Sequence, residues 1–250
     1  MTLRRIFPLL FLTTLSARAE ESFVKAVDTI KHSVAPIVCL TVAQDGTAKL
    51  DFIEGSGFFI SKDGSFVTAR HVISEMEPSP LRRPCNTPAV YIPKSGKWSD
   101  EGRFVDIKWF AFHLDQCVLS SPVVDLARCR TQDDLSKDKD VITPPEPVTI
   151  DAKLPPEGTD IAFSGFPLQI TIPRASRATI AGYGSRDNIE TTEMVIDRNT
   201  WPGASGSPIF LASGHVIGVV LARGTNEAAG LAFARTGNEL DKFLKSILEK

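Results

Sequence analysis

The chain lacks the features that mark several large classes of protein. Its 28 Lys and Arg nearly balance its 30 Asp and Glu, so nothing favours nucleic acid or an anionic membrane as the main partner. Its four cysteines form no CxxC pair and have no pair of histidines nearby, which argues against a zinc site. After the first twenty residues, no apolar run is long enough to cross a membrane. We therefore expect no metal, no other cofactor, no nucleic-acid partner and no membrane insertion.

The first twenty residues differ from the rest. Arg4 and Arg5 precede a short apolar run over 6–15, and 17–19 read Ala-Arg-Ala, the small-x-small pattern that signal peptidase recognises. This predicts a signal peptide over 1–19 and a secreted or periplasmic mature chain, since both destinations use the same signal. The alternative is a membrane anchor or a buried helix.

An even number of cysteines behind a signal peptide predicts up to two disulfides, with three possible connectivities. The cysteines are Cys39, Cys85, Cys117 and Cys129. The last two flank a turn at 120–122, Ser-Ser-Pro, so one hypothesis pairs them across a hairpin. The alternative is that one or both pairs are buried free thiols.

Short β-prone runs separated by turn residues make up most of the chain. They cover 37–42, 57–60, 66–68, 90–92, 104–112 and 123–129, and then 160–164, 178–181, 193–197, 208–210, 216–221 and 230–233. This spacing is typical of an antiparallel sandwich or barrel and not of βαβ units. The charged, proline-rich stretch 136–147 predicts a linker. Apolar residues at helical spacing predict a helix over 22–34, ended by Pro36, and another over 238–250.

A serine lies between glycines in the segment 203–208, which reads Gly-Ala-Ser-Gly-Ser-Pro. Glycine allows a tight turn whose N–H groups point into one concavity, where they can bind an oxyanion. Ser205 would still need an adjacent base to act as a nucleophile. The alternative is an ordinary Gly/Ser-rich turn, because short motifs carry false positives.

Two further residues can complete such a site. His71 follows a predicted strand, and histidine is the side chain best able to take and return a proton near neutral pH. Asp125 lies inside the apolar run 123–129, an unfavourable place for a carboxylate unless a histidine N–H bonds to it. The alternatives are a structural histidine and a turn or cap aspartate, and Asp106 and Asp115 are rival partners for the histidine.

In order and context, these blocks resemble the trypsin-like peptidase superfamily, and most closely its bacterial HtrA-like branch. GSGFFI with TARHVI is similar to that branch's histidine block, VDLARCR to its aspartate strand and WPGASGSPIF to its nucleophile block. GTDIAFSGFP and GLAFART are similar to two further segments.

The resemblance runs from Phe23 to Leu244, nearly the whole mature chain. It implies an all-β fold of two six-stranded antiparallel β-barrels, over about 36–135 and 148–237, with short helices at both ends. These barrels would form a single peptidase domain over 20–250. Many relatives carry a PDZ domain after the peptidase, and we expect none here.

The resemblance also implies roles. Ser205 would attack the scissile carbonyl, His71 would accept its proton and later protonate the leaving amine, and Asp125 would orient the histidine. The N–H groups of Gly203 and Ser205 would form an oxyanion hole, with Ala204 shaping the loop. The expected function is that of a serine endopeptidase acting on proteins or peptides outside the cytoplasm.

Some positions depart from the family pattern. Ala204 stands where many digestive members carry an aspartate, so no trypsin-type zymogen activation is expected. The expected substrate pocket consists of Asn199, Thr200, Val219, Val220 and Leu221. Asn199 at its floor is not acidic and its wall is apolar, so small or medium aliphatic residues are expected at the cleavage site.

Two other functions remain open. One is a binding or chaperone-like protein on the same fold with little or no turnover, because fold alone does not settle function. The other is an esterase or acyl transferase using the same three residues. The chain lacks the G-x-S-x-G elbow and the βαβ pattern that belong to that enzyme class.

Overall fold

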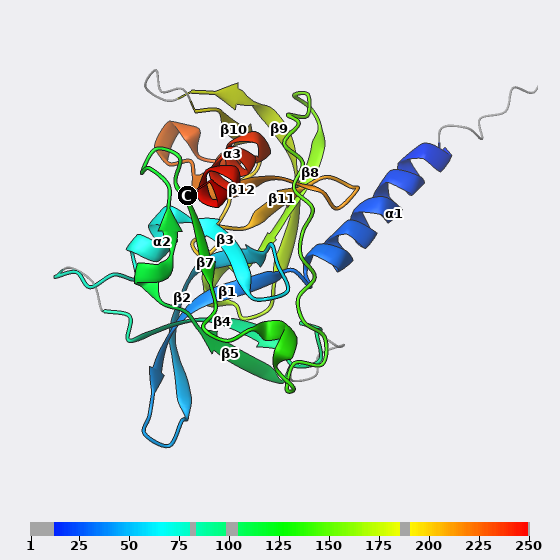
Figure 1. Cartoon of the computed structure of the whole chain (residues 1–250). Helices are drawn as coiled ribbons and strands as arrows, with labels where there is room; N and C mark the ends of the chain where they lie inside the picture. The colour runs from blue at the N-terminus through cyan, green and yellow to red at the C-terminus, as the bar shows by residue number, and fades with distance from the viewer. Residues whose placement is uncertain (1–12, 81–83, 99–104, 186–190, 250) are drawn as a thin grey trace, which may run out of the picture.

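The computed structural model describes residues 13–80, 84–98, 105–185 and 191–249. Figure 1 shows two β-rich halves packed together, with a helix at each end of this part of the chain. The α-helices of the described residues are α1 (Thr13–Ile30), α2 (Arg70–Ser74) and α3 (Gly237–Leu248). None of them is both long and apolar enough to cross a bilayer. The predicted signal peptide falls mostly on 1–12, outside the described residues.

The first half is an antiparallel sheet of seven strands in the order β5-β4-β1-β2-β3-β7-β6. The strands are β1 (Val34–Val42), β2 (Ala48–Phe59), β3 (Ser65–Ala69), β4 (Thr87–Pro93), β5 (Ile107–Ala111), β6 (Val118–Leu119) and β7 (Leu126–Arg130). The end of β5 meets the end of β7 at a bridge between Phe112 and Thr131, and the Gln132 N–H donates to the Ala111 carbonyl at 2.8 Å. Six strands therefore form a curved sheet whose first and last strands meet at their ends. The remaining strand, β6, has two residues and pairs only with β7 in the described sheet.

The second half is a closed antiparallel barrel in the order β10-β13-β12-β11-β8-β9. Its strands are β8 (Asp160–Gly165), β9 (Arg174–Gly184), β10 (Glu193–Ile196), β11 (Pro208–Phe210), β12 (Val216–Arg223) and β13 (Ala232–Thr236). The all-β, trypsin-like fold class is confirmed. The expected second barrel is found, whereas the first half is a curled seven-stranded sheet and not a closed six-stranded barrel. The additional strand arises because the chain before Asp125 pairs back on β7 as a short hairpin.

A shared hydrophobic core joins the two halves. One cluster fills the first sheet and continues into the second half through Phe166, Phe210 and Val219. A second cluster, which includes Ile161, lies within the barrel. Burial of apolar surface is the main favourable term in folding, so the shared cluster holds the two sheets against each other.

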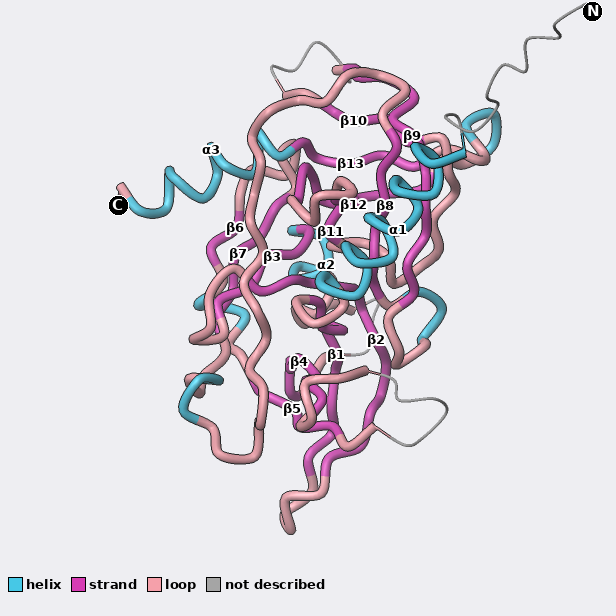
Figure 2. The backbone as a smooth tube through the Cα atoms, turned by 90° about the vertical axis from the view of Figure 1, so that its right-hand side faces the viewer, coloured by secondary structure: helices cyan, strands magenta, loops and turns pink. Residues whose placement is uncertain are grey.

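The first helix differs from its prediction over 22–34 at both ends, since it begins at Thr13 and ends at Ile30. Phe23, Ala26 and Ile30 are buried, whereas Val24 is 70% exposed, as expected for a helix with one apolar face. Figure 1 shows the N-terminal part of α1 extending away from the body, and Figure 2, which faces that side of the molecule, shows the helix in front of the region of β8 and β9. The helix ends at Ile30 and not at Pro36, because the chain turns at once and enters β1, where Pro36 pairs with Ser56.

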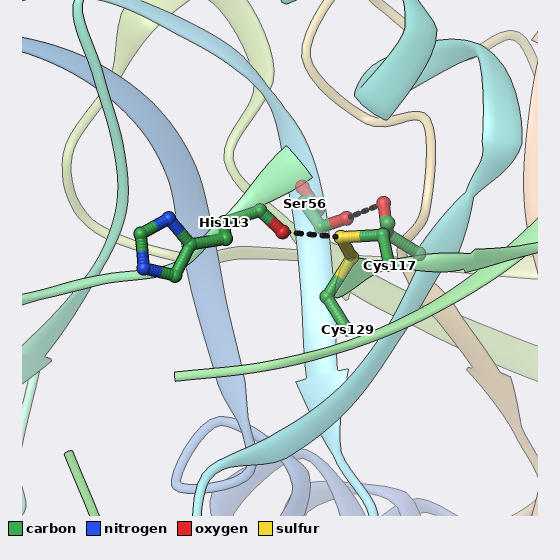
Figure 3. Close-up of a disulfide and its surroundings, with 5 residues drawn as sticks. Ser56, His113, Cys117 and Cys129 are labelled. Atoms are coloured by element: carbon green, nitrogen blue, oxygen red, sulfur yellow. Dashed lines mark hydrogen bonds between the residues drawn. A yellow bond between two sulfur atoms is a disulfide. The ribbon is translucent and has the colours of Figure 1, made fainter. Parts of the chain in front are cut away.

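Both pairs of cysteines are joined. Cys39 bonds to Cys85, and Cys117 bonds to Cys129, so the described chain contains no free cysteine. Figure 3 shows the second bridge, with the His113 carbonyl oxygen 3.5 Å from Cys117 Sγ. The predicted pairing across a hairpin is confirmed, and the bridge closes the loop that carries Asp125.

Removing either disulfide should lower the free energy of unfolding, because the bridge restricts the unfolded chain. The bridges enclose sequence separations of 46 and 12 residues, for which chain entropy gives about 4 and about 3 kcal/mol. Urea unfolding of the two double-alanine variants measures the losses. In the presence of a reductant, which opens both bridges, the wild type and the two variants should unfold at similar urea concentrations. Without reductant, a variant that unfolds at the same urea concentration as the wild type would contradict the expectation.

Candidate active site

The histidine lies at the junction between strand and helix. All five residues of β3 are buried, and α2 begins directly after it, so the backbone leading to His71 is fixed by the core. The His71 side chain is 32% exposed. It is therefore held by the protein on one side and open on another.

The carboxylate that binds His71 is that of Asp125. Its Oδ2 lies 2.8 Å from His71 Nδ1, and its Oδ1 accepts from the His71 backbone N–H at 2.9 Å. The rival Asp106 pairs instead with Lys94. The prediction that Asp125 sits within a strand is wrong: β7 begins at Leu126. Asp125 has a φ of 55°, which turns its carboxylate toward α2.

This arrangement determines which ring nitrogen carries hydrogen. A carboxylate only accepts hydrogen bonds, so Nδ1 must be the donor and Nε2 is left as the basic nitrogen. Burial lowers the pKa of His71, but the hydrogen bond and charge of Asp125 raise it, as do the charges of Glu75 and Glu54. The net result is a pKa above the ordinary value of 6.5.

The serine lies on a loop that requires its two glycines. Gly203 and Gly206 have φ values of 91° and 85°, in the region that side chains disfavour. A Cβ on Gly206 would lie 2.0 Å from the Ser56 carbonyl oxygen. The Ser205 hydroxyl donates to the Leu221 carbonyl at 3.0 Å, and in the described structure it has no hydrogen bond to His71.

Two N–H groups of this loop are unpaired. The Ala204 N–H donates to the Trp201 carbonyl at 2.9 Å, which closes the turn. Within the described part of the chain, the N–H groups of Gly203 and Ser205 have no acceptor. Two free donors beside a serine hydroxyl are what an oxyanion site requires.

Ser56 connects the serine loop to the first sheet. This residue is fully buried on β2. Its Oγ donates to the Gly203 carbonyl at 2.7 Å and accepts from the Phe166 N–H at 2.9 Å. Its backbone N–H donates to the Ser205 carbonyl at 2.8 Å. This role of Ser56 was not predicted, although its place between two glycines in an apolar run is a signal that the sequence contains.

The same network reaches the strand that precedes the histidine. Thr68, on β3, donates its hydroxyl to the Ser56 carbonyl at 2.7 Å. A Cβ on Gly55 would lie 2.6 Å from a Val72 methyl and 3.0 Å from the Ser205 carbonyl oxygen. The structure therefore brings the serine loop against the segment that carries His71.

The expected pocket residues occupy different environments. Val219 packs in the cluster shared by the two halves, and Val220 packs inside the barrel. Val220 and Leu221 reach the serine loop through backbone carbonyls, which accept from the Gly206 N–H and the Ser205 hydroxyl. Thr200 is buried, and the Asn199 Oδ1 is a buried atom without a hydrogen-bond partner in the described structure.

No cluster for a metal is present in the parts of the chain described. Within them, no group of three or more His, Cys, Asp or Glu side chains is placed to hold a metal ion. The groups gathered at this place are the Ser205 hydroxyl, the His71 imidazole, the Asp125 carboxylate and the backbone N–H groups already described.

A closed antiparallel barrel packed against a second, curled antiparallel sheet is the architecture of the trypsin-like fold class. Within that class, the model of the trypsin-like peptidase domain matches residues 55–219. The chain therefore belongs to the trypsin-like peptidase family, as the sequence blocks predicted.

Two solved proteases agree with this chain in architecture, and a further protein is similar to it in sequence. The active form of the Rv3671c protease from M. tuberculosis is 21% identical and aligns over 88% of this chain and 82% of its own, with a TM-score of 0.59. The HtrA-type protease AlgW with a tripeptide is 20% identical, with 91% and 64% covered and a TM-score of 0.63. The uncharacterized protein y4bJ of Sinorhizobium fredii is 29% identical over 181 residues, which span 68% of this chain and 22% of that protein.

Replacing Ser56 with alanine should destabilise the protein strongly. The change leaves the Gly203 carbonyl and the Phe166 N–H buried without their shared partner, and an unpaired buried polar group costs about 1–3 kcal/mol. We expect Ser56→Ala to lower the free energy of unfolding by about 2–4 kcal/mol in urea titrations. Ser213→Ala, in an exposed turn, is the control, and equal effects of the two changes would contradict the expectation.

Proposed function

We propose that this protein is a serine endopeptidase in which Ser205 is the nucleophile, His71 the general base and Asp125 the residue that orients the histidine. The observation that carries the proposal is a pair of hydrogen bonds from His71 to the Asp125 carboxylate, one from the ring at 2.8 Å and one from the backbone N–H at 2.9 Å. Such a hold is what a base needs to keep Nε2 free and correctly aimed.

The proposed reaction has two stages. The Ser205 oxygen attacks the peptide carbonyl while His71 Nε2 takes its proton, and the N–H groups of Gly203 and Ser205 stabilise the oxyanion. His71 then gives the proton to the leaving amine, which leaves an acyl-enzyme. A water molecule attacks that ester by the reverse sequence, releasing the carboxylic acid and restoring the serine.

The resting hydroxyl must rotate for this reaction. Its hydrogen bond runs to the Leu221 carbonyl, and catalytic hydrogen bonds commonly tighten only when substrate binds. The same observation favours a second candidate function, a latent or inactive binding protein on this fold. The free N–H groups beside Ser205 support the peptidase over that alternative, because a binding protein has no need of them.

We propose that the chain is secreted or periplasmic, with a signal peptide over 1–19 and one peptidase domain over 20–250. The two disulfides support this location, because such bonds persist mainly in oxidising compartments. The proposed substrates are proteins or peptides cut after small or medium aliphatic residues, because Asn199 supplies no charge for a basic side chain.

A fluorophosphonate probe tests the proposed nucleophile. Ser205 should displace fluoride from the probe and form a phosphonate ester, with His71 taking the hydroxyl proton. Intact-mass and peptide mapping should place the label on Ser205 in the wild type and detect none in Ser205→Ala or His71→Ala.

Two matched controls accompany that experiment. Ser213→Ala and His113→Ala change a serine and a histidine outside the site and should label like the wild type. A well-folded wild type that does not label would contradict the peptidase and favour the binding protein.

The labelling rate should depend on pH through His71. Only the neutral imidazole can accept a proton, and the His71 pKa lies above 6.5, so the rate should rise with pH through a midpoint above that value. Rates measured from about pH 5 to about pH 9 define the midpoint. In Asp125→Asn the limiting rate should fall by about 10⁴-fold, and a rate independent of pH in the wild type would contradict the role of His71.

A further inference from the structure

A buried arginine on the second half reaches into the first. Arg235 lies on β13 and is 4% exposed. A buried charge is unfavourable unless it is paired and hydrogen-bonded. Glu193, which is 8% exposed, lies directly opposite Arg235 in the register of β10 and β13, so an acidic residue is placed beside this cation on the neighbouring strand.

The guanidinium bonds to the loop that precedes Asp125. Its Nε donates to the Val124 carbonyl at 2.9 Å, and its Nη2 donates to the Val123 carbonyl at 2.6 Å. A longer bond, 3.4 Å, joins Nη1 to the Thr192 carbonyl of its own half. The planar fork of arginine suits two neighbouring acceptors, and bonds from a charged donor are stronger than neutral ones.

Asp125 needs such support because of its backbone. A φ of 55° is unusual for a residue other than glycine. Conformations of this kind persist where the surroundings enforce them. Within the first half, two hydrogen bonds hold the Asp125 backbone: the Asp125 N–H donates to the Ser121 carbonyl, and the Arg70 N–H donates to the Asp125 carbonyl. Arg235 acts from the opposite side, on the two residues just before the aspartate.

We propose that Arg235 is a positioning residue that holds the Val123–Val124 backbone so that the Asp125 carboxylate meets His71. One consequence is that the His71–Asp125 pair forms fully only when the two halves are docked, because the residue that completes it belongs to the barrel. The catalytic meaning of this role rests on the proposed peptidase function. The positioning itself rests on the contacts alone.

The pKa of His71, followed by NMR of the imidazole resonances, tests the positioning without any enzymatic assay. If Arg235→Met releases the loop, Asp125 should hold His71 less well and the His71 pKa should fall. The reference is Asp125→Asn, which removes the carboxylate charge and should lower the pKa further. The other carboxylates that raise this pKa, Glu54 and Glu75, are left in place in every variant.

A general control for the loss of an arginine is Arg177→Met, which removes a half-exposed arginine on β9 that pairs with Asp160. It should leave the His71 pKa at the wild-type value. Loss of the Arg235 charge alone would raise the His71 pKa, so it cannot imitate the expected fall. An unchanged His71 pKa in a folded Arg235→Met protein overturns the proposal. If that variant does not fold, Arg235→Lys decides: lysine keeps the charge without the planar fork, so the pKa should still fall, and a wild-type value overturns the proposal.

Labelling by the fluorophosphonate supplies the catalytic readout. For Arg235→Met, the limiting rate should fall about tenfold to a hundredfold, as small misplacements of catalytic groups do, while the probe concentration for half-maximal rate stays the same. If the wild type is not labelled, the peptidase proposal is contradicted, but the His71 pKa measured by NMR still decides the role of Arg235. The two failures are therefore distinguishable.

Discussion

The hydrogen bonds of the buried Ser56 are the interaction on which the site depends most. One hydroxyl and one peptide unit of β2 hold Gly203, Ser205 and Phe166 of the other half, and Thr68 closes the network on the strand before His71. Because the bonds of the Ser56 hydroxyl and of Thr68 are buried, each of these bonds that is lost leaves an unpaired polar atom in the core. The loop position is therefore a property of the whole interface and not of the loop's own sequence.

Docking of the two halves sets the remaining geometry. The shared hydrophobic cluster brings the barrel against the first sheet, and this apolar contact is not directional. Direction comes from polar contacts across the same boundary, of which Ser56 acts on the serine side and Arg235 on the aspartate side. A site divided between two sheets is in this way kept to one arrangement.

The chain has the fold of its family, and the proposed reaction depends on three of its side chains. Asp125 and His71 already form a pair, but the Ser205 hydroxyl rests on the Leu221 carbonyl. Rotation of one hydroxyl therefore separates the resting arrangement from a reactive one. The solved peptidases share the architecture of this chain at about one fifth sequence identity. Its substrate preference therefore depends on its own residues around the site.

The amino-acid sequence by itself predicted the β-rich halves, a disulfide across the hairpin and Ser205 as a candidate nucleophile, because each leaves a local mark: short β-prone runs between turns, a cysteine spacing, a serine among glycines. The family, and with it the proposed roles of His71 and Asp125, came from the resemblance of whole sequence blocks. The sequence pattern placed Asp125 inside a strand, since nothing local announces a left-handed aspartate. Only the tertiary structure chose Asp125 over its rivals as the partner of His71, and only it showed the resting hydroxyl bond and the contacts of Ser56 and Arg235. The Ser56 and Arg235 side-chain bonds to the opposite half join residues more than a hundred positions apart, and no local pattern records which distant carbonyl a buried donor will meet.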